Sequence, residues 1–140
     1  MKREAVIVSG YFNPLHVGHL ELFEKSSSEG AFLIVIVNSD LQRELKGSKE
    51  FMPEDERLKI VQSIKGVGTA LISIDKDSTQ NETLTHLHEL YSGNWDLHFA
   101  NGGDQNNDTI PESVICNKLG ITLIDGLGDK IQSSSWLLNK

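Results

Sequence analysis

The stretch "AFLIVIV", Ala31–Val37, contains no polar residue, and it decides the fold class of this chain. A strand with one face in water alternates apolar and polar residues, whereas a strand covered on both faces is apolar throughout. This run therefore predicts a central strand of a parallel sheet with helices on either side.

The sequence on both sides of this run alternates short apolar runs with helical patterns. Helix 53–66 is the clearest, because Pro53 and three acidic residues open it and Lys65-Gly66 closes it. Such alternation predicts a parallel α/β sheet whose ligands bind at the carboxyl ends of the strands. The other predicted strands are 5–9, 69–74, 97–100 and 121–125, and the other predicted helices are 19–30, 81–93, 111–120 and 133–140.

Composition limits the classes of function. The chain has 140 residues, the size of one domain, and its 20 acidic residues outnumber 13 basic ones, which argues against general nucleic-acid binding. No apolar run approaches the ~20 residues that span a bilayer. Cys116 is the single cysteine, so no intrachain disulfide can form. We expect a cytoplasmic protein that contacts neither nucleic acid nor membrane.

Four unusual stretches directly follow predicted strands, so they should meet at one edge of the sheet. They are "GYFNPLHVGH", "NSDLQRELKGSKEF", "NGGDQNN" and "GLGDKIQSSS". In the first, His16 and His19 would lie one turn apart on one helix face if a helix begins near His16 or Val17. They could then act together on a small anion beside the helix N-terminus, or simply cap and pack it. A zinc site is disfavoured, because no third histidine or cysteine stands at ligand spacing.

The last stretch has the composition of a phosphate site. Lys130 precedes three hydroxyls, Ser133, Ser134 and Ser135, at an expected helix N-terminus, where free N–H groups bind anions. The alternative is that one serine is only an N-cap.

Two further groups have both a functional and an ordinary interpretation. In "ANGGDQ", Asn101 and Asp104 could bond to a base or ribose while Gly103 lets a flat ring approach, or the segment is a tight turn. Lys46 and Arg57 could supply positive charge to phosphates, or be solvated surface charges.

Together these stretches resemble the cytidylyltransferase-like nucleotidylyltransferases. "GYFNPLHVGH" resembles their H-x-G-H signature, and "KIQSSSWLL" resembles their serine/threonine motif. "LKGSKEFMPEDERLKIVQSIK" is similar to the segment after the second strand in ethanolamine-phosphate cytidylyltransferases and heptose-phosphate adenylyltransferases. The resemblance implies one nucleotidylyltransferase domain over 1–140, with a Rossmann-like parallel five-stranded sheet and helices on both faces.

The resemblance also implies an activity and a set of site residues. The activity is transfer of a nucleotidyl group from a nucleoside triphosphate, carried with Mg²⁺, to a phosphorylated alcohol or sugar, with release of pyrophosphate. His16, His19 and Lys46 would be catalytic, and Arg57 would line the acceptor side. The implied nucleotide-binding residues are Gly10, Tyr11, Phe12, Asn13, Gly18, Asn101, Gly103, Asp104, Lys130, Ser133, Ser134 and Ser135.

The choice of nucleotide stays open between CTP, the first candidate, and ATP, as used by heptose-phosphate adenylyltransferases. The oligomeric state also stays open, and a homodimer is compatible with the resemblance. A hypothesis of a different class is a nucleotide-binding regulator without turnover.

Overall fold

Every strand expected from the sequence is present, and helices connect the strands. The computed structural model describes residues 3–12, 17–26, 31–47, 49, 52–77, 79–100 and 112–124. The strands are β1 (Arg3–Gly10), β2 (Phe32–Val37), β3 (Thr69–Ile72), β4 (Trp95–Ala100) and β5 (Thr122–Ile124). The helices are α1 (Val17–Ser26), α2 (Asp40–Lys46), α3 (Glu54–Gln62), α4 (Asn81–Tyr91) and α5 (Glu112–Leu119).

The five strands form one sheet in the order β3-β2-β1-β4-β5, and every pairing is parallel. The chain runs outward from β1 through β2 to β3, then returns to the other side of β1 with β4 and β5. This is a Rossmann-like α/β fold, as predicted. The order reverses between β1 and β4, and the carboxyl ends beside such a reversal are where open α/β sheets bind ligands.

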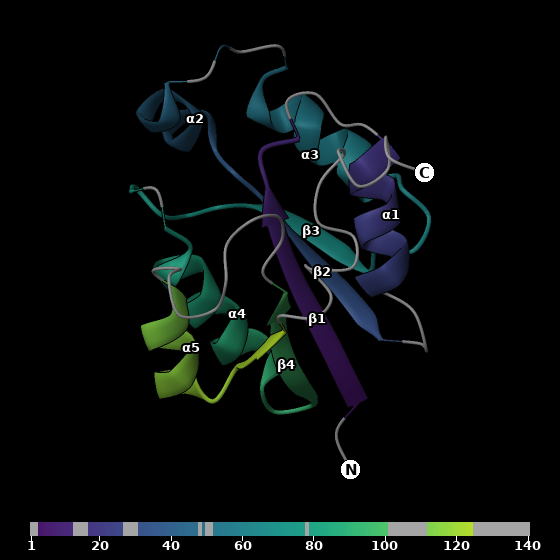
Figure 1. Ribbon diagram of the computed structural model, residues 1–140, viewed down its shortest axis with the longest axis vertical. Coiled ribbons are helices and arrows are strands. Elements are labelled where there is room, and N and C mark those ends of the chain that lie inside the picture. The colour runs from purple at the N-terminus through teal and green to yellow at the C-terminus, as the bar shows by residue number, and fades with distance from the viewer. Residues whose placement is uncertain are drawn as a thin grey trace, which may run out of the picture.

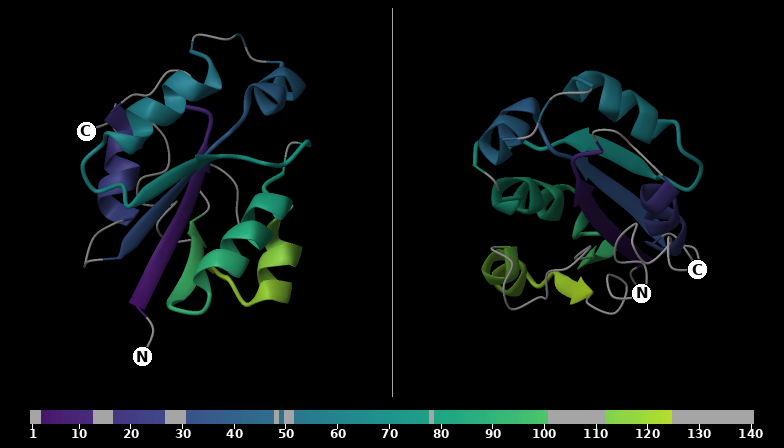
Figure 2. Two further views of the ribbon diagram at one scale, coloured as in Figure 1. Left: turned by 180° about the vertical axis from the view of Figure 1, so that it is seen from behind. Right: turned by 45° about the horizontal axis from the view of Figure 1, so that its top comes forward.

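Helices cover both faces of the sheet. Figures 1 and 2 show α1 and α3 on one side of it and α4 and α5 on the other. The two apolar clusters agree: Phe23 of α1 and Val61 of α3 join one, while Leu84 of α4 and Cys116 of α5 join the other. The sheet is therefore the middle of three layers.

Strand β2 confirms the prediction from its composition. Leu33 and Val35 belong to the cluster beneath α1 and α3, whereas Ile34 and Ile36 belong to the cluster beneath α4 and α5. All four side chains are 0% exposed. Apolar side chains on both faces are what the two helical layers require.

Several elements differ from the ranges expected from the sequence. Residues 40–46, for which the sequence analysis predicts no helix, form α2, which lies at the carboxyl end of β2 (Figure 1). Helix α1 ends at Ser26, earlier than the predicted Gly30, and β3 ends at Ile72, before the predicted residue 74. The predicted helix 133–140 lies outside the described residues. Among the described helices, none combines the length and the apolar character needed to cross a membrane.

The single cysteine offers a direct test of this packing. Cys116 is 0% exposed in the cluster beneath α4 and α5. Burial, followed by the charge of Glu112, raises its pKa to about 12. Since the thiolate is the reactive form, the folded protein should resist alkylation by iodoacetamide up to about pH 9, where an ordinary thiol is largely ionised. Mass spectrometry should find the label only after denaturant is added, and rapid labelling of native protein would contradict this packing.

Candidate active site at the carboxyl edge of the sheet

The ends of three neighbouring strands are joined by hydrogen bonds just beyond the sheet. The Asn38 amide donates to the Gly10 carbonyl at 2.9 Å, and the Ser73 amide donates to the Val37 carbonyl at 2.8 Å. The loops after β1, β2 and β3 therefore start from one fixed edge. Gly10, Tyr11 and Phe12, all predicted site residues, lie at this edge.

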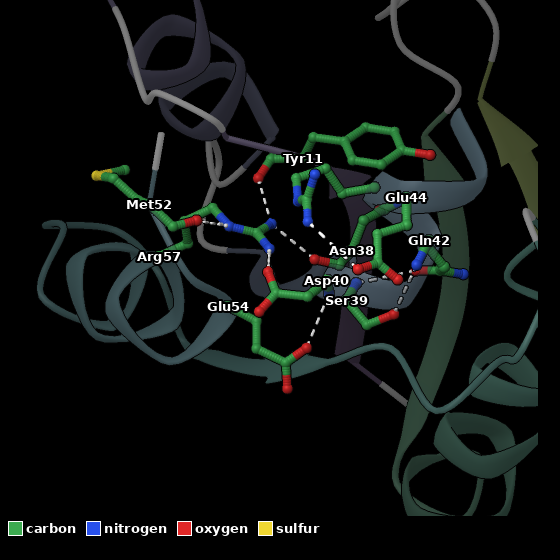
Figure 3. A network of polar contacts seen from close by, with 10 residues as sticks. Tyr11, Asn38, Ser39, Asp40, Gln42, Glu44, Met52, Glu54 and Arg57 are labelled. Atoms are coloured by element: carbon green, nitrogen blue, oxygen red, sulfur yellow. Dashed lines mark hydrogen bonds and ion pairs between the residues drawn. The ribbon is translucent and has the colours of Figure 1, made fainter. Parts of the chain in front are cut away.

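Arg57 of α3 lies at the centre of this edge, and it is fully buried. Its Nη1 donates to the carbonyls of Tyr11 and Asn38, each at 2.7 Å, and its Nε donates to the carbonyl of Met52 at 2.9 Å. Its Nη2 donates to Asp40 Oδ1 at 2.7 Å, which completes an ion pair (Figure 3). Four of the five N–H donors of the guanidinium therefore have protein acceptors.

The expectation of a solvated surface charge at Arg57 is wrong, because the side chain is 0% exposed. A guanidinium can be buried when its charge is paired and its donors are bonded, which is the case here. Contact of Arg57 with the phosphorylated acceptor substrate stays a prediction, and the hydrogen bonds that Arg57 makes within the protein do not support it.

Helix α2 is fixed at its N-terminus by three side chains. Ser39 and Gln42 form a capping box, in which each side chain accepts a hydrogen bond from the other residue's amide at 3.1 Å. Glu54 of α3 accepts from the Asp40 amide at 2.8 Å. Lys46, a predicted catalytic residue, is the last residue of this helix. The S-x-x-Q pattern at 39–42 is the signal from which α2 could have been predicted.

The turn after β1 has an unusual backbone. Phe12 has φ of 53°, in the left-handed region that bulky residues avoid, which costs on the order of 1–3 kcal/mol. Its ring is 2% exposed and packs edge-on against Phe23, with centroids 5.5 Å apart. The ring also lies over Gly10, where an added Cβ would come within 2.8 Å of it. The absence of a side chain at Gly10 therefore allows the ring of Phe12 to approach the main chain closely.

Helix α1 begins at Val17, two residues before the start of the predicted helix 19–30. Gly18 and His19 lie in its first turn. Four of the five described helices have an acidic residue in the first turn, and α1 has none. The positive end of the α1 dipole is therefore not offset by a carboxylate of that turn, an arrangement suited to an anion.

Helix α4 at the same edge shows the opposite arrangement. The Asp75 carboxylate accepts hydrogen bonds from the amides of Glu82 and Thr83, each at 2.8 Å. The N-terminus of α4 is therefore capped by a carboxylate of the protein itself. Asp75 is 3% exposed, and the sequence analysis did not single it out.

A second chain of hydrogen bonds connects the two sides of the edge. Asn38 Oδ1 accepts a hydrogen bond from the side-chain Nε2 of Gln80 at 3.2 Å. The main-chain amide of Gln80 donates to Glu112 Oε2 at 2.8 Å. The main-chain carbonyl of Asn38 also accepts a hydrogen bond from Arg57 of α3. The segment after β2 is therefore bonded directly to α3, and through Gln80 to Glu112 at the start of α5. Sequence reasoning missed all three of these polar residues, which are at most 7% exposed.

Other predicted site residues cannot be placed in this network. His19 and Lys46 are described by their positions in α1 and α2 alone. Those outside the described residues are Asn13, His16, Asn101, Gly103, Asp104, Lys130, Ser133, Ser134 and Ser135. Within the described ranges, no group of three His, Cys, Asp or Glu residues could hold a metal ion.

The tight packing at Gly10 predicts the effect of one added methyl group. The Cβ of Gly10→Ala would lie 2.8 Å from Phe12 Cζ and 2.9 Å from Cε1, so the buried ring must move. We expect a loss of about 1–3 kcal/mol of unfolding free energy in urea titrations. Gly93→Ala is the matched control, since its Cβ would meet nothing within 4 Å. Equal stability of the two variants would contradict the packing of Phe12 over Gly10.

Three curated relatives are similar to this chain over all or part of its length. Over its whole length the chain is 29% identical to the D-beta-D-heptose 1-phosphate adenylyltransferase of Bordetella bronchiseptica, and it covers 83% of that protein. Over 67 residues, 48% of the chain, it is 40% identical to the FAD synthase of Methanoculleus marisnigri. Over 69 residues it is 41% identical to the bifunctional protein HldE of Koribacter versatilis. These two shorter matches span only 44% and 14% of the respective relatives.

A solved structure has the same fold. The lipopolysaccharide core biosynthesis protein of Thermoplasma volcanium superposes with a TM-score of 0.67 and 26% identity, over 86% of this chain and 91% of that one. Residues 7–119 match the family described as cytidylyltransferase-like, from within β1 to the end of α5. Since this match covers most of the 140 residues, the chain belongs to the cytidylyltransferase-like family.

Proposed function

We propose that this protein transfers a nucleotidyl group from a nucleoside triphosphate to the phosphate of a small phosphorylated alcohol or sugar and releases pyrophosphate. Membership of the cytidylyltransferase-like family supports the reaction class. The observation that carries the proposal is that α1, whose first turn contains His19, follows β1 at the carboxyl edge where such sheets bind ligands, with the rest of the histidine motif between them in sequence.

The electrostatics of this edge support a phosphate-bearing substrate. Helix α1 has no acidic residue in its first turn, whereas α4 is already capped by Asp75. A triphosphate would therefore be attracted to the N-terminus of α1, whose first turn carries no carboxylate, rather than to the N-terminus of α4, where Asp75 already accepts the amide hydrogens.

The proposed reaction needs no covalent enzyme intermediate. An oxygen of the acceptor phosphate forms a bond to the α-phosphorus, and the bond from that phosphorus to the bridging oxygen breaks. The electron pair leaves with pyrophosphate. Since the acceptor phosphate is already a nucleophile, the protein has to position the two substrates and stabilise the developing charge.

The proposed roles follow the sequence motifs. His16 and His19 would donate to oxygens on the α-phosphorus, and Lys46 would orient the attacking phosphate. Ser133, Ser134 and Ser135, with Lys130, would bind the outer phosphates. Asn101, Gly103 and Asp104 would contact the base and ribose.

Mg²⁺ would enter with the triphosphate as part of the substrate. The four carboxylates of the network at this edge are already engaged: Asp40 pairs with Arg57, Glu54 accepts from the Asp40 amide, Asp75 accepts from the α4 amides, and Glu112 accepts from the main-chain amide of Gln80. The phosphate oxygens would therefore supply most of the ligands of the cation, which would offset their charge during transfer.

For the nucleotide, the names of the relatives favour ATP over CTP. The relative matched over the whole chain is an adenylyltransferase, and FAD, the product named for another relative, contains an adenylyl group. CTP, the first candidate from the sequence alone, is kept as the second nucleotide of the test.

The decisive experiment is a pyrophosphate-release assay with ATP and with CTP, each with Mg²⁺. The acceptor panel should contain sugar 1-phosphates, glycerol 3-phosphate, phosphoethanolamine and flavin mononucleotide. Release with one pair identifies both substrates. Binding of a nucleotide without release across the whole panel would contradict the proposal and favour a nucleotide-binding regulator.

Replacement of His16 tests the proposed charge stabilisation. His16→Ala should lower kcat by about 10²–10³-fold, the usual loss for one transition-state donor, with little change in thermal stability. His86→Ala is the matched control, because His86 is an exposed histidine of α4 and should keep full activity. Near-normal turnover of His16→Ala would exclude this mechanism.

Replacement of Ser134 tests the serine motif. Ser134→Ala should weaken triphosphate binding by about tenfold, since a hydrogen bond to a charged phosphate is lost. Isothermal titration with a non-hydrolysable triphosphate measures this directly. Unchanged affinity would mean that the serine motif only caps a helix.

A further inference from the structure

The contacts of Arg57 are unusual because three of its four acceptors are main-chain carbonyls, two of them from distant parts of the chain. They belong to Tyr11, Asn38 and Met52, in the segments after β1, after β2 and before α3. We propose that Arg57 is a positioning residue for the transfer reaction: by holding the Tyr11 carbonyl, it fixes the turn from which the histidine motif starts. This inference rests on the proposed function.

The geometry of the guanidinium supports this role. Its planar fork donates to Tyr11 and Asn38 from one nitrogen and to Asp40 from the other, each at 2.7 Å. A lysine ammonium carries all its donors on one nitrogen and cannot reproduce this spread. Because the side chain is 0% exposed, water cannot easily replace a lost contact.

The backbone of Phe12, the residue after Tyr11, also supports this role. Phe12 has φ of 53°, and a bulky residue keeps such a conformation only where its surroundings enforce it. Two described contacts stabilise this conformation of Phe12: Arg57 donates to the carbonyl of Tyr11, and Phe23 packs against the ring of Phe12. Such strained residues gather at functional sites, and here the next residues in sequence are 13–16 of the histidine motif.

Arg57 also connects two segments with proposed catalytic residues. Its pairing with Asp40 fixes the first residue of α2, the helix that ends in Lys46, and Glu54 of α3 holds the Asp40 amide. One residue thus sets the relative placement of the turn after β1 and of α2. A misplacement of about 1 Å at a reacting centre can cost about 10²-fold in rate, so loss of Arg57 should act on turnover.

The test compares Arg57→Lys and Arg57→Met with Asp75→Asn. Asp75 is the matched control because it too is a buried charge at the same edge, and its described partners lie in α4 and in the segment 73–79. For each variant, kcat and KM for the nucleotide are measured by pyrophosphate release, and Tm by circular dichroism.

We expect all three variants to lose several degrees of Tm. Both Arg57 variants should also lose about 10²-fold in kcat, with KM for the nucleotide changed by less than about threefold. Asp75→Asn should keep kcat within about twofold. Retained kcat in folded Arg57→Lys and Arg57→Met would overturn the inference, as would an equal loss of kcat in Asp75→Asn.

A second readout separates this inference from the proposed function. Absence of turnover by the wild-type protein would report on the function alone. Hydrogen exchange, followed by mass spectrometry of a peptide spanning 9–12, then decides the inference. Faster exchange of that peptide in the Arg57 variants than in Asp75→Asn supports the positioning role, and equal exchange in all variants overturns it. If Arg57→Lys fails to fold, Arg57→Met provides the same comparison.

Discussion

The burial of β2 on both faces is the constraint from which the rest of the fold follows. Its apolar side chains face α1 and α3 on one side and α4 and α5 on the other, and none is exposed between Leu33 and Val37. Removing this apolar surface from water is the main favourable contribution to folding. Because both faces are covered by helices, ligands can approach the middle of the sheet only at its edges. The polar chemistry is therefore gathered at the carboxyl edge.

At that edge two buried charges of opposite sign organise the main chain. Arg57 donates hydrogen bonds to carbonyl oxygens of three segments, and Asp75 accepts hydrogen bonds from amides at the start of α4. Each charge is stabilised because the groups around it complete its hydrogen bonds. Asn38 lies between them, bonded to Arg57 through its carbonyl and to Gln80 through its side chain. The loops of the candidate site are thus held by backbone contacts on either side of β2.

The elements that bury apolar surface could be predicted from the sequence, since periodicity reports burial directly. Strand β2 is an example, since its unbroken apolar run is buried on both faces. Helix α3 was predicted from the residues at its two ends, and its Val61 is fully buried. Helix α2 was missed because it is short and largely polar, although the capping pattern of Ser39 and Gln42 marks its start.

Much of the candidate site could not be predicted in the same way. The partners of Arg57 are mostly carbonyl oxygens, which every residue has, so no pattern of side chains points to them. An arginine in a predicted helix is usually exposed, and only tertiary contacts reverse that expectation. The left-handed turn at Phe12 is equally hidden, because phenylalanine is an unusual residue for it.

The use of carbonyl groups by Arg57 has an evolutionary consequence. A carbonyl oxygen is the same whatever side chain its residue carries, so positions 11 and 52 can change identity while the hydrogen bonds persist. Only Arg57 itself and its carboxylate partner Asp40 are constrained in residue type by this network. With such an arrangement, the main-chain geometry of the site does not depend on the side chains that its surface presents. Side chains around the edge are free to diverge toward new substrates without loss of the geometry beneath them.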